Sequence, residues 1–159
     1  MSPLKHSGFR DGFRSELANR EFARRAMAIL AERTAGLESA AFWRGYHELE
    51  ELNAPRFAAA ARRLNAAPSR PRAALARGWV TGHTPAAVLP ELLRFAYPRT
   101  VEYAADLRRL RDIGPLSERE FLDYMVRQED LQVRMMHSAL LGEYEAITAM
   151  VQEFIAAET

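Results

Sequence analysis

Residues 117–156 read SEREFLDYMVRQEDLQVRMMHSALLGEYEAITAMVQEFIA and carry the clearest helix signal of the chain. Ser117 and Glu120 have the spacing of a capping box, and Leu116 and Phe121 flank it like a hydrophobic staple. The pattern predicts one unbroken helix over the whole stretch, roughly 60 Å long at ~1.5 Å per residue. Because this length exceeds that of a compact bundle, we expect its C-terminal turns to pack on a partner subunit in a homodimer.

Three further long helices are predicted upstream by helix-forming composition and by glycine and proline signals. The predicted segments are about 9–33, 37–64, 84–112 and 117–156, with a short helix at about 72–80. Pro55 lies inside the second segment, which therefore either kinks there or restarts with Asn53 as its cap. A crossover of about twenty residues joins the second and third long helices, as in ferritin-like bundles. The sequence thus predicts an all-α fold, an antiparallel four-helix bundle with one long crossover, in a single domain over residues 1–159.

The bulk composition is that of an ordinary globular chain, and it excludes several functional classes. Of the 159 residues, 48% are hydrophobic and 27% are charged, the net charge is +1, and cysteine is absent. This balance provides no overall field for nucleic acid and no cysteine nucleophile, disulfide or cysteine metal site. No apolar run follows Met1, and none reaches the ~20 residues of a membrane span. We therefore expect a cytoplasmic protein with no signal peptide and no nucleic-acid or membrane partner.

Glutamates interrupt the apolar stripes of the predicted long helices. Glu16 falls on the stripe of the first helix, Glu50 on that of the second and Glu129 on that of the last. Glu102 flanks the stripe of the third, so each long helix can turn one glutamate inward. Buried carboxylates need a counter-charge, and four together would repel one another. Two solutions are open: divalent metal between the carboxylates, or an inward arginine, for which Arg20 is available to Glu16.

The order of these residues resembles the ferritin-like di-iron carboxylate family, which includes the ferritins and rubrerythrins. The matching positions are Glu16, then Glu50 with Asn53, then Glu102, then Glu129 with Gln132. The resemblance extends over about residues 9–140, and the segment EELNAPRF at 50–57 is similar to the second-helix motif of a rubrerythrin. It implies a ferritin-like bundle that holds iron or manganese. In that arrangement Glu50 and Glu129 would be the bridging ligands, and Glu16 and Glu102 the terminal ones.

The sequence departs from this family at two positions where the family has histidine. Asn53 and Gln132 stand there, and both would lie beside the metal ligands. Amide oxygen is a weaker ligand for iron than imidazole, whereas an all-oxygen site suits Mn²⁺, Mg²⁺ or Ca²⁺. We therefore expect a degenerate carboxylate site with weak divalent-metal binding, and metal-dependent redox chemistry if the protein is an enzyme.

A non-enzymatic interaction module is a second possible function. No acidic residue lies between Glu51 and Glu91, where six arginines stand, and no basic residue follows Arg134. These two charge blocks suit a dimeric module that presents either the arginine-rich crossover or the acidic end of the last helix to a partner.

A helical small-molecule binder is the third possible function. Trp43, Tyr46 and Tyr103 are placed to line a pocket together with the methionines of the last helix. The chain has no glycine-rich phosphate loop and no Gly-x-Ser-x-Gly elbow, so the sequence offers no other catalytic motif.

Overall fold

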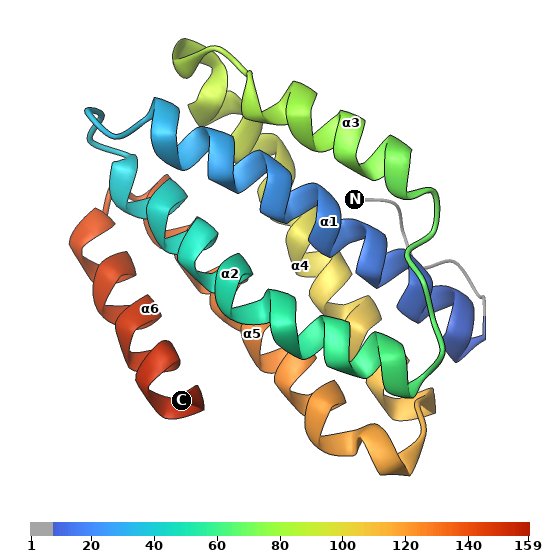
Figure 1. Ribbon diagram of the computed structural model, residues 1–159. Helices are drawn as coiled ribbons and strands as arrows, with labels where there is room; N and C mark the ends of the chain where they lie inside the picture. Colours follow the sequence, from blue (N-terminus) through green and yellow to red (C-terminus); the bar gives the residue numbers. More distant parts are fainter. Residues whose placement is uncertain (1–7) are drawn as a thin grey trace.

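The computed structural model describes residues 8–159, and every regular element in that range is helical (Figure 1), which confirms the all-α class. The α-helices are α1 (Phe9–Arg33), α2 (Ala40–Arg63), α3 (Pro71–Gly82), α4 (Leu89–Ile113), α5 (Arg119–Leu140) and α6 (Tyr144–Glu158). Short 3-10 turns, Ala86–Val88 and Leu116–Glu118, precede α4 and α5. Residues 1–7, which include the start of the chain used for the signal-peptide expectation, lie outside the described residues.

The four longest helices run side by side around a common core. Figure 1 shows that α1 and α5 run in one direction, whereas α2 and α4 run in the opposite one. Helix α1 contacts α2 and α4, and α5 contacts the same two helices, so neighbours among the four are antiparallel. Helix α3 lies along the outside of α1, and α6 lies along α2 and α5. No described helix is both long enough and apolar enough to cross a membrane.

Small residues bring α3 unusually close to α1. Ala74, Gly78 and Gly82 recur every four residues and form its buried face. A Cβ added at Gly78 would lie 2.7 Å from the backbone oxygen of Phe22, and one added at Gly82 would lie 2.8 Å from the Ile29 side chain. The two helix backbones therefore approach closely, and the larger side chains of α3 are left on its outer side.

The prediction of a single helix over residues 117–156 is wrong, because the chain reverses at Gly142. Its φ of 75° is the left-handed conformation that glycine adopts readily. The N–H of Glu143 donates to Ser138 O at 2.9 Å, and that of Gly142 donates to Ala139 O at 3.2 Å, which is the Schellman pattern of a helix end. Helix α6 then folds back on α2 and α5. It therefore packs on its own chain, so the long projecting helix on which the homodimer expectation rested does not form, and the homodimer stays a prediction.

The predicted capping box also does not form. Helix α5 begins at Arg119, and no side chain caps its N-terminus. Leu116, the expected staple residue, is 80% exposed. The buried carboxylate of Glu118 instead accepts hydrogen bonds of 2.8 and 2.7 Å from Arg63 of α2. A tertiary ion pair therefore takes the place of the local cap at this turn.

Helix α2 is continuous through Pro55, so neither a restart nor a cap at Asn53 occurs. The side chain of Asn53 is buried and donates from Nδ2 to Gln128 Oε1 of α5 at 3.0 Å. Asn53 therefore forms a hydrogen bond in the interior of the protein and does not cap a helix.

Two apolar clusters fill the space between the long helices, and a polar layer separates them. One cluster contains Leu30 and Met135, and the other contains Phe13 and Leu107. In α1, α2 and α5, most of the buried polar residues lie between the residues that pack in the first cluster and those that pack in the second. The candidate site is this polar layer.

Candidate functional site

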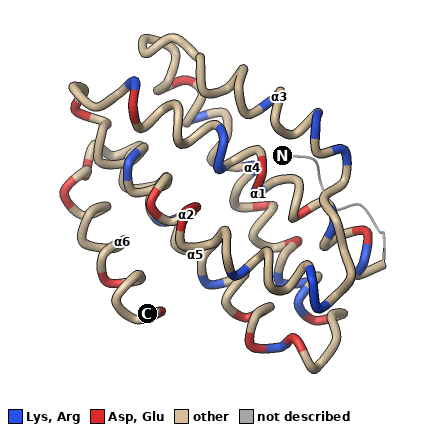
Figure 2. The backbone as a smooth tube through the Cα atoms, in the orientation of Figure 1, with Lys and Arg blue, Asp and Glu red and all other residues tan. Residues whose placement is uncertain are grey.

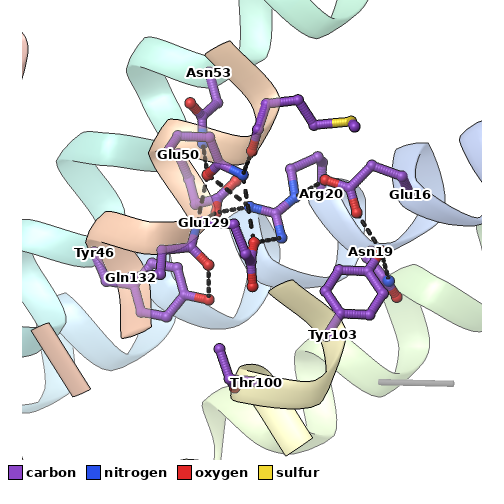
Figure 3. A network of polar contacts seen from close by, with 12 residues as sticks. Glu16, Asn19, Arg20, Tyr46, Glu50, Asn53, Thr100, Tyr103, Glu129 and Gln132 are labelled. Atoms are coloured by element: carbon purple, nitrogen blue, oxygen red, sulfur yellow. Dashed lines mark hydrogen bonds and ion pairs between the residues drawn. The ribbon is translucent and has the colours of Figure 1, made fainter. Parts of the chain in front are cut away.

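Arg20 of α1 lies at the centre of the polar layer and contacts three carboxylates (Figure 3). Its Nη1 donates to Glu50 Oε1 at 2.8 Å, and its Nη2 donates to Glu129 Oε2 at 3.3 Å. Its Nε lies 3.0 Å from Glu16 Oε1, one helical turn earlier in α1. The three glutamates are at most 1% exposed. Of the two solutions that the sequence left open, the structure realises the inward arginine, which serves all three glutamates.

Amide side chains of α2 and α5 complete the hydrogen bonding around the carboxylates. Gln132 Nε2 donates to Glu50 Oε1 at 3.0 Å, and its Oε1 accepts from the Tyr46 hydroxyl at 2.7 Å. Gln128 Oε1 accepts from Gln132 at 2.8 Å as well as from Asn53. The two amides at the family's histidine positions are therefore committed to this network as donors and acceptors.

Helix α4 contributes Tyr103 to the site instead of Glu102. The Tyr103 hydroxyl donates to Glu16 Oε2 and lies 2.5 Å from Asn19 Nδ2. Tyr103 is 2% exposed, whereas Glu102 is exposed. The prediction that Glu102 turns inward is wrong, because one residue corresponds to about 100° around a helix and the buried stripe runs through Tyr103 and Leu107.

Burial dominates the electrostatics of the site. Desolvation raises the pKa of Glu50 to about 7 and the pKa of Glu129 to about 8, against the attraction of Arg20. Desolvation also raises the pKa of Glu16, and again Arg20 opposes the shift. Burial by itself would lower the pKa of Arg20, but the three carboxylates raise it well above its usual value. Near neutral pH the site thus has one permanent positive charge, on Arg20, and its three glutamates together carry fewer than three negative charges.

Two carboxylate oxygens in the site, Glu16 Oε1 and Glu129 Oε1, have no hydrogen-bond partner among the described residues, although Glu16 Oε1 forms the ion pair with Arg20 Nε. Glu129 Oε1 is buried and makes no hydrogen bond within the described part of the chain, whereas Glu129 Oε2 accepts from Arg20 and, at 3.3 Å, from Gln128 Nε2. An unpartnered, buried oxygen favours the protonated form of a carboxyl group. This geometry agrees with the direction of the pKa of Glu129.

The residues present do not fit the di-metal centre that the resemblance implies. A guanidinium occupies the space between Glu16, Glu50 and Glu129. Glu102 points to solvent, and among residues 8–159 no group of three or more acidic, histidine or cysteine side chains is arranged to hold a metal ion. Two metal cations and one guanidinium would compete for the same three carboxylates.

A cavity connects the site with the surface between α1 and α2. It has a volume of about 360 Å³, and its lining includes Arg20, Glu50, Arg24 and Phe57. The carboxyl group of Glu50 therefore has a route for proton exchange with solvent, although its side chain is buried.

An apolar pocket lies on the other side of Tyr46, where α1, α2, α4 and α5 meet the end of α3. Its volume is about 170 Å³. The lining includes Phe22, Met27, Trp43, Tyr46, Leu93 and Met136. Trp43 is 4% exposed, and its Nε1 makes no hydrogen bond to the described residues. Because Tyr46 also donates to Gln132, the same side chain borders the pocket and the polar layer.

Sequence reasoning found most of the charged residues of this site and missed several neutral ones. Asn19 and Gln128 were not predicted, although Asn19 follows Glu16 by three residues and so shares its face of α1. Gln128 precedes Glu129, and only the helix packing shows that both side chains are buried. Comparisons give no relative for the chain: no protein-family model matches it, and no curated protein or solved structure matches it.

Proposed function

We propose that α1, α2, α4 and α5 form a ferritin-like four-helix bundle. The antiparallel neighbours support this topology, and so does the long connection through α3 between the parallel helices α2 and α4. The position of the carboxylates supports it as well, since Glu16, Glu50 and Glu129 come from three of the four helices and converge on one centre.

In this bundle Arg20 takes the place of the metal cations. A guanidinium satisfies the carboxylates with directed hydrogen bonds and one positive charge, and protonation of Glu50 and Glu129 removes the remaining negative charge. Iron or manganese is therefore no part of the function that we propose, and no redox step follows from the site.

The function proposed for the protein is binding of a small apolar molecule in the pocket beside Trp43 and Tyr46. The observation that carries it is the pocket itself, which is walled mainly by aromatic and aliphatic side chains, as ligand sites usually are. A cavity of about 150 Å³ holds benzene, so a pocket of about 170 Å³ suits a single ring. Trp43 lines the pocket, and its Nε1 makes no hydrogen bond to the described residues, so the ligand that we propose is a ring bearing an oxygen acceptor.

Fluorine NMR with fluorobenzene and para-fluoroacetophenone tests this proposal. Both probes should broaden in the presence of the protein, and the ketone should bind more tightly. Ala96→Phe fills the pocket and should abolish the broadening of both probes. Ala105→Phe is a matched control on α4, because Ala105 is half-buried but lies away from the pocket. Trp43→Phe should remove the preference for the ketone. Equal broadening in the Ala96→Phe variant, or no broadening with the unchanged protein, would reject the pocket as a binding site.

A further inference from the structure

The outer side of α3 is an exposed apolar surface with positive charge. Because Ala74, Gly78 and Gly82 form the side packed on α1, the opposite side faces away from the molecule. Trp79 is 51% exposed and Val80 is 64% exposed. Large apolar side chains grouped on a surface usually mark an interaction site.

The charges of α3 are of one sign. Arg72 and Arg77 are exposed and are the charged residues within Pro71–Gly82. Arg77 lies at the edge of the outer side, because its guanidinium is also 5.6 Å from the centre of the Phe22 ring of α1. The nearest acidic residues in sequence are Glu51 and Glu91, which lie in α2 and α4. We call Arg72, Ala76, Arg77, Trp79 and Val80 the α3 face.

Helix α6 has the complementary character. Ile147 and Val151 pack inward, and the opposite side consists of small, acidic and amide residues. We call Glu145, Ala149, Gln152, Glu153 and Ala156, all of them exposed, the α6 face. Figure 2 shows red and no blue along this helix, because no basic residue follows Arg134.

The two faces cannot meet within one molecule. Helix α3 lies against α1, whereas α6 lies against α2 and α5. Figure 1 shows them at opposite margins of the molecule, with α1 and α2 between them. Complementary faces on opposite sides of one chain are the condition for a head-to-tail contact between copies.

We propose that the α3 face of one copy docks on the α6 face of a second copy. Trp79 and Val80 would pack over the alanines of α6, and the arginines would lie opposite Glu145 and Glu153. A symmetric contact is disfavoured, since it would place Arg72 and Arg77 against their own counterparts, or the glutamates of α6 against theirs. The contact is therefore heterologous, and each copy keeps one free face of each kind for further growth into a ring or filament.

This inference is independent of the apolar pocket, and sedimentation velocity tests it directly. The unchanged protein should form species larger than a dimer as its concentration rises, and added salt should shift them toward monomer. Arg72→Glu with Arg77→Glu disables the α3 face, and Glu145→Arg with Glu153→Arg disables the α6 face. All four positions are exposed, so both variants should keep the circular dichroism spectrum of a folded protein. The α3 variant should melt slightly lower, because it loses the contact of Arg77 with the Phe22 ring.

The decisive step is to mix the two variants. Each alone should be a monomer, because it retains only one working face. Together they should assemble again into species larger than a dimer. The intact α3 face of one variant can bind the intact α6 face of the other, and the two charge-reversed faces also carry opposite charges. The proposal is overturned if the unchanged protein stays monomeric up to millimolar concentration, if either variant alone still assembles, or if the mixture stays monomeric.

Discussion

Arg20 Nη1 donates a hydrogen bond to Glu50 Oε1 at 2.8 Å, across 30 positions of sequence and from α1 to α2. Both side chains are buried. A buried ion pair gains little over apolar packing when intact, but loss of one partner leaves an uncompensated charge. The pair therefore makes the whole polar layer depend on a single arginine, which also serves Glu16 and Glu129.

Removal of this arginine should destabilise the protein strongly. Arg20→Ala leaves three buried glutamates without a counter-charge, and we expect a loss of about 3 to 5 kcal/mol in the free energy of unfolding. Urea denaturation at neutral pH measures it. Arg24→Ala is the matched control, because Arg24 pairs with Glu51 at 2.9 Å with both side chains about half exposed. That change should cost less than about 1 kcal/mol. Equal costs for the two variants would contradict a central role for Arg20.

Stability should fall as the pH rises through neutrality. The pKa of Glu50 is raised from 4.5 to about 7 and that of Glu129 to about 8 by burial. Between pH 4.5 and these values the folded protein holds more protons than the unfolded chain, so each increase in pH favours unfolding. The contribution is fully present below pH 4.5 and is lost as the pH passes 7 to 8. Urea denaturation at a series of pH values measures the slope.

Glu129→Gln provides the internal test of that slope. The amide mimics the protonated carboxyl group, so the variant should lose part of the pH dependence between about 5 and 8. Glu51→Gln is the control, because the Arg24 hydrogen bond lowers the pKa of Glu51, which moves its titration to acid pH. A slope that is unchanged in Glu129→Gln would show that this carboxyl group is ionised in the folded protein throughout the range.

The close approach of α3 to α1 should make Gly78 sensitive to any side chain. Gly78→Ala places a Cβ 2.7 Å from a backbone oxygen, so the helices must separate, and we expect a cost of about 1 to 3 kcal/mol. Gly36→Ala, where a Cβ meets nothing within 4 Å, should change stability by less than about 0.5 kcal/mol. Chemical denaturation of both variants decides the matter, and a neutral Gly78→Ala would show that α3 is loosely attached.

The sequence was sufficient to predict most of the helices and three of the four inward glutamates, because apolar periodicity is a local property. Glu16, Glu50 and Glu129 lie on stripes that are buried in the structure. The prediction that Glu102 turns inward failed because Glu102 is only one position away from the buried stripe. Tyr103, the next residue, lies on that stripe and is buried.

The break at Gly142 was missed for a different reason. The residues on both sides of Gly142 favour a helix, and an isolated glycine within such a pattern is often tolerated. Glycine adopts its φ of 75° readily, but the packing of α6 on α2, which favours a turn over a continued helix, is a tertiary contact. Likewise, the choice between metal and Arg20 depends on how three helices meet, which no single stripe determines.

Elemental analysis of the purified protein, after growth with added iron and manganese, tests most directly the claim that Arg20 replaces the metal cations. We predict no stoichiometric transition metal in the unchanged protein and no difference in metal content on Glu50→Ala with Glu129→Ala. Iron or manganese bound near one or two atoms per chain, and lost in that double variant, would contradict the account and place a metal centre in the polar layer.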